Sequence, residues 1–207
     1  MNLEFALFIM IILVLGQKFF KIKTLEFDSN ILKDHERKNK FIKKMLEWSG
    51  YKRMDLIYRG SRDGMTSNNF HNKCDNKGPT IVLYKNEKSI FGGFTSISWS
   101  TDGNWHSSPD CFIFTLINIH NTEPTKFPLK NNDSNAVYHY SKHGPCFGGG
   151  HDIGVNQSDY LTNKIYTNFP YSYQDVLGKG KSIFNGNLNN SNEHFYLKEI
   201  EVFKLFK

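Results

Sequence analysis

Cysteine is scarce in this chain of 207 residues, and its three cysteines, Cys74, Cys111 and Cys146, lie far apart. Three scattered thiols are too few for a disulfide framework, so a reducing compartment is the simpler inference. No two of them form a Cys-x-x-Cys pair, and none of the eight histidines belongs to a His-Glu-x-x-His motif. The common zinc sites use these spacings. The sequence therefore predicts no metal ion and no cofactor.

Long apolar runs are also lacking. The longest, Phe5 to Leu15, has eleven residues, whereas a helix needs about 20 to span a bilayer. Its length is typical of the hydrophobic part of a secretory signal cleaved before Gln17, but no Lys or Arg precedes it and Glu4 is acidic. Two alternatives follow for residues 1–20: a signal or anchor that contacts a membrane, or a helix or strand packed on the domain.

The chain has only a modest excess of positive charge, because it contains 26 Lys and Arg and 20 Asp and Glu, a net charge of +6. Nucleic-acid-binding proteins usually gather basic and aromatic residues on one face. Here the densest basic run, residues 33–44, contains Asp34 and Glu36, and its apolar residues recur at helical spacing. We expect a solvated helix face and no nucleic-acid partner. Contact with an acidic partner or a membrane surface is the alternative.

Complete catalytic motifs are missing as well. Residues 178–182 read GKGKS, but Asp175 replaces the first glycine of a phosphate-binding loop, and no Gly-x-Ser-x-Gly occurs. These observations leave no evident site for phosphoryl transfer or for serine-dependent hydrolysis, and they favour a protein that is not an enzyme.

Two thiols lie near histidines. Cys74 follows His71 by three residues, so the two share a face if they lie on a helix. Cys146 follows His143 by three residues and precedes His151 by five. A nucleophilic cysteine needs a neighbouring base and a lowered pKa. A small peroxidase-like enzyme that uses Cys74 or Cys146 is therefore the enzymatic alternative.

Aromatic residues are plentiful, with eighteen Phe and ten Tyr, which suits a sheet-rich interior. Helices are predicted over residues 30–48 and 68–74. The segment from 118 to 192 is rich in Asn, Ser, Gly and Pro and predicts long loops. Many short strands with few helices favour two packed sheets. The predicted strands cover residues 54–58, 80–85, 90–95, 111–118 and 195–206.

Two polar motifs stand out. In YRGSRDG, we expect Arg59 to bridge loop carbonyls and Asp63 to cap the turn before Gly64, with an interaction role for Arg62 as the alternative. In FGGGHDI, the three glycines allow a tight crossing in which Asp152 binds the free amides of the turn. The alternative is a partner-facing surface or an anion-binding nest. The partner-binding candidates are Gly148, Gly149, Gly150, His151, Asp152 and Arg62.

Four motifs in a fixed order resemble the TLDc domain of the oxidation-resistance proteins. They are LIYRGSRDGMTSNNFHNKCDNKGPT from Leu56, IFGGFTSISW from Ile90, FGGGHDI from Phe147 and KEIEVFKL from Lys198. The resemblance covers residues 24–207 and leaves residues 1–23 as a separate apolar segment.

The resemblance implies an α+β, mainly β fold: an antiparallel two-sheet β-sandwich with two flanking helices and long loops. It also implies a non-enzymatic interaction module that acts in oxidative-stress resistance, in the binding and regulation of the vacuolar proton pump (V-ATPase), whose subunits would then be its partners, or in both. TLDc proteins generally work in the cytosol or nucleus, so the resemblance implies a cytoplasmic protein. If residues 5–15 act as a signal, the alternative is a secreted or membrane-tethered binding domain.

Overall fold

The computed structural model describes residues 27–131, 133–156, 163–188 and 194–207. The apolar run from Phe5 to Leu15 lies outside these ranges, so both alternatives for the first 20 residues stay open. Within the described ranges, no helix combines the length and the apolar character that crossing a membrane requires.

The first sheet contains the strands that the sequence predicted best. All neighbouring strands pair antiparallel, in the order β1-β12-β2-β3-β5-β6. The predicted strands 80–85 and 90–95 are confirmed as β2 and β3. Both strands are buried on their two faces, so they are apolar without alternation. The strands are β1 (Arg53–Arg59), β2 (Thr80–Lys85), β3 (Ile90–Thr95), β5 (Phe112–Ile117), β6 (Thr125–Pro128) and β12 (Glu199–Phe206).

The second sheet corrects the prediction of long loops between residues 118 and 192. Its order is β11-β10-β9-β8-β7-β4, and most of its strands come from that segment. Each has only three to five residues, too few for alternation to stand out from the Gly, His and Asn around it. The strands are β4 (Asn104–His106), β7 (Val137–His139), β8 (His143–Phe147), β9 (Ile153–Asn156), β10 (Lys164–Tyr166) and β11 (His194–Tyr196).

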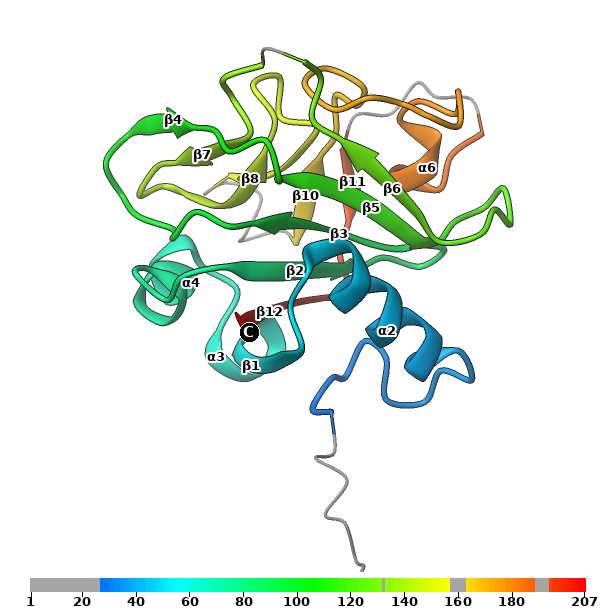
Figure 1. Ribbon diagram of the computed structural model, residues 1–207, viewed down its shortest axis with the longest axis horizontal. Coiled ribbons are helices and arrows are strands. Elements are labelled where there is room, and N and C mark those ends of the chain that lie inside the picture. Colours follow the sequence, from blue (N-terminus) through cyan, green and yellow to red (C-terminus); the bar gives the residue numbers. More distant parts are fainter. Residues whose placement is uncertain (1–26, 132, 157–162, 189–193) are drawn as a thin grey trace, which may run out of the picture.

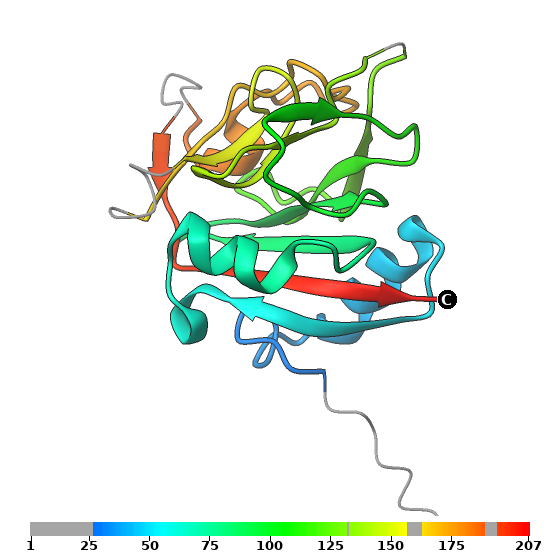
Figure 2. The ribbon, with the colours of Figure 1, turned by 90° about the vertical axis from the view of Figure 1, so that its left-hand side faces the viewer.

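The last predicted strand, 195–206, is in fact two strands in different sheets. At the crossing, the Leu197 amide donates to Asn163 O (2.7 Å) and the Lys198 amide donates to Lys85 O (2.7 Å). Adjacent residues thus bond to opposite layers, and β12 continues in the first sheet (Figure 2).

Four helices lie in the described part of the chain: α2 (Lys38–Ser49), α3 (Gly60–Asp63), α4 (Ser67–Cys74) and α6 (Ser182–Asn185). The long helix begins eight residues later than predicted, because residues 30–34 and 36–37 form turns and Ser29 Oγ accepts from the Leu32 amide (3.0 Å). It ends at Ser49, one residue beyond the predicted end at residue 48, and Gly50 follows with a φ of 72°. Thr66 caps α4, since its side chain accepts a hydrogen bond from the Asn69 amide (3.1 Å).

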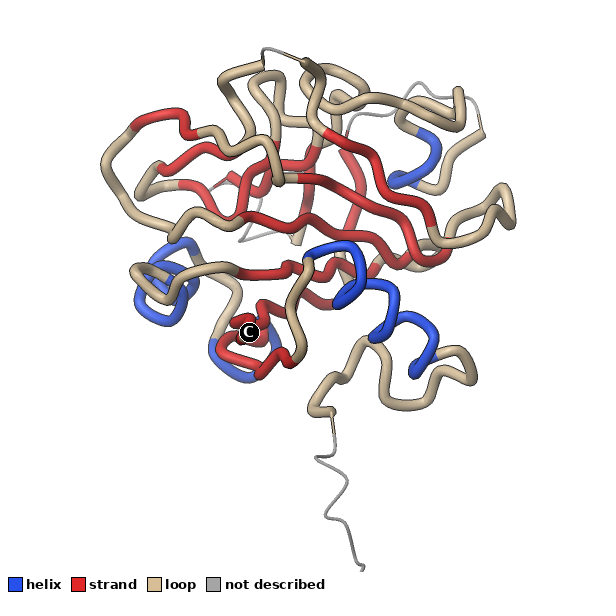
Figure 3. Tube along the Cα trace, in the orientation of Figure 1, coloured by secondary structure: helices blue, strands red, loops and turns tan. Residues whose placement is uncertain are grey.

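Two apolar clusters hold the layers together. One fills the space between the sheets and includes Tyr84, Phe91, Phe147 and Ile165. The other lies on the opposite face of the first sheet, where α2 packs over it. The structure confirms the mainly β, two-sheet antiparallel sandwich (Figures 1 and 3).

Candidate functional site

Arg59 is the centre of a buried ion-pair network that joins three parts of the chain. Its Nε donates to Glu201 Oε1 (2.7 Å) and its Nη2 to Asp28 Oδ1 (2.6 Å). Glu201, on β12, is fully buried and also accepts from Ser29 Oγ (2.6 Å) and the Asn30 amide (2.7 Å). The expected bridging of loop carbonyls was therefore wrong, because the partners of Arg59 are carboxylates. Burial alone would lower the pKa of Arg59, but its hydrogen bonds to Asp28 and Glu201 raise it, and the net shift is upward.

Asp63 organises the beginning of α3 rather than the turn after it. Its Oδ2 accepts from the Arg59 amide (2.9 Å) and from Arg62 Nη2 (2.7 Å). The bond from Arg62 is the main reason that the pKa of Asp63 lies below its usual value. The Arg62 side chain is 44% exposed, so part of it can contact a partner.

The FGGGHDI segment follows β8 and is tied to the loop at residues 171–172. Asp152 is fully buried and accepts from the amides of Tyr171 (2.6 Å) and Ser172 (2.8 Å). Asp152 thus binds free amides, as expected, but those of a distant loop instead of its own turn. Gly148 has a φ of 84°, and a Cβ there would collide with the Asp152 carboxylate. Burial raises the pKa of Asp152 to about 6, against the opposing effect of its amide bonds.

The candidate residues therefore divide into two groups. Gly148 and Asp152 are committed to the internal bonds of the segment, whereas Gly149, Gly150 and His151 are half-buried and reach the surface. Arg62 lies on α3 beside the first sheet, while the glycine segment belongs to the second sheet. The two candidate regions are thus parts of different layers.

An aromatic face, which the sequence analysis missed, covers the outer side of the second sheet. Trp105 stacks on Tyr138 with ring centroids 4.4 Å apart, and Tyr138 lies 6.2 Å from His151. Strand pairing places Trp105 opposite Tyr138 and Tyr166 opposite His194 on this face. The sequence signal was weak, because the aromatic and histidine residues of this face are spread over several short strands and turns, with neighbours in sequence up to 33 positions apart. We call this set the outer aromatic face: Trp105, Tyr138, Tyr140, His143, His151, Tyr166 and His194.

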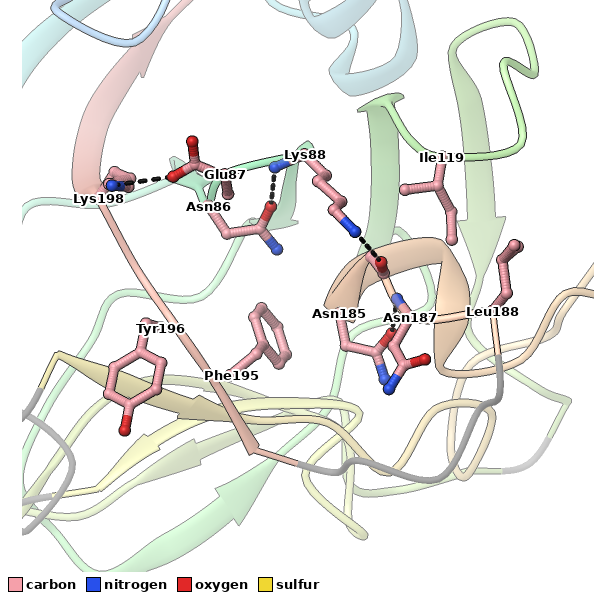
Figure 4. A pocket seen from close by; sticks show the side chains of 11 residues that line it. Asn86, Glu87, Lys88, Ile119, Asn185, Asn187, Leu188, Phe195, Tyr196 and Lys198 are labelled. Carbon is pink, nitrogen blue, oxygen red and sulfur yellow. Dashed lines mark hydrogen bonds and ion pairs between the residues drawn. The ribbon is translucent and has the colours of Figure 1, made fainter.

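A surface groove of 830 Å³ lies between the β2–β3 turn, α6 and β11 (Figure 4). Lys198 Nζ is paired with Glu87 Oε2 (2.9 Å), and Lys88 Nζ donates to Gly186 O (3.4 Å). Its described lining contains no histidine or cysteine, and its one carboxylate belongs to Glu87. The described lining therefore offers neither a thiol nor an imidazole, and its Glu87 carboxylate is paired with Lys198.

The thiols of Cys74 and Cys146 are fully buried, and burial raises the pKa of both. A raised pKa keeps a thiol protonated and unreactive, the opposite of what a nucleophile needs. His71 does share α4 with Cys74, but its Nδ1 is bonded to Asp75 Oδ1 (2.8 Å). Its Nε2 faces the carbonyls of Tyr140 (3.1 Å) and His143 (2.9 Å). The ring joins α4 to the second sheet and is not engaged as a base for Cys74.

Both ring nitrogens of His71 face acceptors, so only the imidazolium form donates at both ends. Burial lowers the pKa of His71, but Asp75 and the two carbonyls raise it by more, so the net shift is upward from 6.5. A raised pKa adds stability that is complete below pH 6.5 and is lost as the pH rises through the folded-state pKa. We expect His71→Gln to lower the free energy of unfolding by about 1.5 to 3 kcal/mol at pH 6.

At alkaline pH the same substitution should cost less, because wild type has then lost the charged bonds. Urea unfolding of both proteins between pH 6 and pH 9 measures this difference. A difference that does not change with pH would contradict a charged His71.

Comparison with known proteins identifies the family. The sequence matches the TLDc domain over residues 25–206. A 62-residue stretch is 31% identical to the MTOR-associated protein MEAK7 of Danio rerio, and covers 30% of this chain and 14% of that protein. The chain thus spans only a small part of that relative. Since the TLDc match runs through both sheets, the chain belongs to the TLDc domain family.

Proposed function

We propose that this domain is a non-enzymatic protein-interaction module that acts in resistance to oxidative stress by binding V-ATPase. The observation that carries the proposal is the TLDc match over residues 25–206, which includes both sheets and all the described helices. The relative in Danio rerio is described as an mTOR-associated protein, which also supports a role in association with other proteins. The V-ATPase partner rests on the resemblance to oxidation-resistance proteins.

Two surfaces are proposed to face the partner. One is the exposed guanidinium of Arg62, which Asp63 holds in a fixed orientation through bonds to Nε (3.1 Å) and Nη2 (2.7 Å). The other is the half-buried stretch Gly149–His151, which Gly148 and Asp152 support from below. Oriented, partly exposed groups lose little entropy when they bind, which favours their use in recognition.

Affinity capture from an extract of the native cells tests this proposal. Wild-type domain should recover V-ATPase subunits, and Arg62→Ala and His151→Ala should each recover less. Lys44→Ala on α2 is the matched control, because Lys44 is similarly exposed and paired with Glu47. Failure of the folded wild type to recover any pump subunit under gentle conditions would refute the V-ATPase role.

The buried thiols allow a test of the enzymatic alternative. Since alkylation needs the protein to open locally, Cys74 and Cys146 should react at least about 100-fold more slowly than in the urea-unfolded chain. Mass-resolved iodoacetamide labelling measures the rates site by site. Fast labelling of either residue, together with peroxide turnover that disappears in Cys74→Ser or Cys146→Ser, would favour the peroxidase-like enzyme instead.

A further inference from the structure

Beneath the outer aromatic face, the fold gathers three side chains of types that bind transition metals. His143 and Cys146 lie on β8, and His151 lies in the turn before β9. The sulfur atom of Cys146 and one nitrogen of each imidazole are all within 4.8 Å of one another. The spacing His-x2-Cys-x4-His is not a standard zinc motif, so sequence reasoning could not single it out.

The backbone accounts for this grouping. His151 adopts a positive φ of 57° in a turn closed by its amide bond to Gly148 O (2.8 Å). Gly154 pairs with Cys146 across the β8–β9 ladder. A Cβ at Gly154 would lie 3.3 Å from the Cys146 sulfur and 3.1 Å from His151 Cβ. The glycine thus leaves the space in which the thiol and the imidazole meet.

No described hydrogen bond competes for the three groups. Among the described hydrogen bonds, none engages the Cys146 thiol or the ring nitrogens of His143 and His151. Ring contacts hold the imidazoles instead: His143 and His151 are perpendicular with centroids 5.4 Å apart, and Tyr138 packs on His143 at 5.5 Å. His71 Nε2 fixes the backbone of His143 through its carbonyl (2.9 Å). The ligands are therefore positioned by packing while their lone pairs stay free.

We propose that His143, Cys146 and His151 bind a zinc ion, with the fourth position open to water. Thiolate and imidazole are the ligands that zinc prefers, at about 2.3 Å and 2.0–2.1 Å respectively. Those bond lengths place the ligand atoms about 3.5 Å apart, so each side chain has to move inward by less than about 1 Å. Binding releases the Cys146 proton to solvent, and the thiolate offsets one charge of the cation.

A second cluster, Asp102, His106 and His139, provides the competing site. Its ligand atoms also lie within 4.8 Å of one another, and His139 Nε2 is buried without a partner in the described structure. However, His106 Nε2 is already bonded to Asp102 Oδ2 at 2.8 Å. To bind at this second cluster, zinc has to break the bond between His106 and Asp102, and the cluster contains no cysteine. The cluster of His143, Cys146 and His151 offers three groups that make no described hydrogen bond.

Titration of the purified, metal-free full chain tests the proposal. Zinc, measured in competition with a chromophoric chelator, should bind with one equivalent per chain and raise the melting temperature. Cobalt(II) should give the near-ultraviolet band of thiolate-to-metal charge transfer. Cys146→Ser should abolish this band, and both Cys146→Ser and His143→Gln should weaken binding at least tenfold, since outer-shell partners alone change metal affinity about 10- to 100-fold.

His106→Asn is the matched control, because it removes a histidine from the competing cluster only, and it should bind zinc as wild type does. Circular dichroism confirms that each variant is folded. Three results would overturn the proposal: no zinc binding by the folded wild type, binding that survives both Cys146→Ser and His143→Gln, or binding that disappears in His106→Asn.

Discussion

Replacing Arg59 with methionine should lower the free energy of unfolding by about 3 to 5 kcal/mol, because it leaves a buried carboxylate without its counterion. Glu201 is fully buried, and the Arg59 side chain is 9% exposed. Methionine fills much of the same volume, so the lost charge dominates over lost packing. Urea unfolding followed by circular dichroism measures the change.

Two further variants make the Arg59 result interpretable. Adding Glu201→Gln to Arg59→Met should recover part of the loss, because the uncompensated charge is then gone. Lys40→Met removes an exposed ion pair with Glu123 and should cost less than about 1 kcal/mol. If the Arg59→Met protein is as stable as wild type, the network does not contribute to holding either residues 28–30 or β1 against β12.

Replacing Gly93 with alanine should destabilise the domain by about 3 kcal/mol, because the two sheets touch at this residue. A Cβ at Gly93 would lie 2.5 to 2.7 Å from three ring atoms of Phe147, which is fully buried in the second sheet. Because the Phe147 ring is fully buried, we expect the clash to strain the packing between the sheets, and overpacking of this kind commonly costs about 1 to 3 kcal/mol. Thermal and urea unfolding both report the loss.

Gly103→Ala is the control for adding a methyl group to a glycine. Its φ is 78° and nothing lies within 4 Å of the new Cβ, so only backbone strain of about 1 to 2 kcal/mol is expected. Combining Gly93→Ala with Phe147→Leu should show a favourable coupling energy, since the shorter side chain relieves the clash. If the two changes in the free energy of unfolding simply add, Gly93 and Phe147 are not in contact.

The first sheet was mostly predictable, because strands such as β2, β3 and β5 are apolar on both faces, whereas β6, with four residues, was not predicted. β2 and β3 begin and end at the predicted residues, and α2 ends within one residue of the predicted end. The second sheet was not predictable, because a strand such as Val137–His139 carries too few residues for any period to appear. Its existence depends on pairing between distant segments, which propensity does not encode.

The candidate site was also predictable only in part. Helical spacing correctly placed His71 and Cys74 on one helix, yet two of the three partners of His71, the carbonyls of Tyr140 and His143, lie about 70 residues away in sequence. Likewise, Asp152 binds amides as expected, but those of Tyr171 and Ser172. Sequence identified the residues that need partners, and only the tertiary structure identified the partners.

Direct binding to purified V-ATPase tests whether this domain is a V-ATPase-binding module. Mixed with the solubilised pump and separated by size, the domain should co-elute with pump subunits, and Arg62→Ala should reduce the bound fraction while Lys44→Ala leaves it unchanged. A domain that elutes alone at every concentration tried, while remaining folded, would contradict the account of this chain as a V-ATPase-binding module.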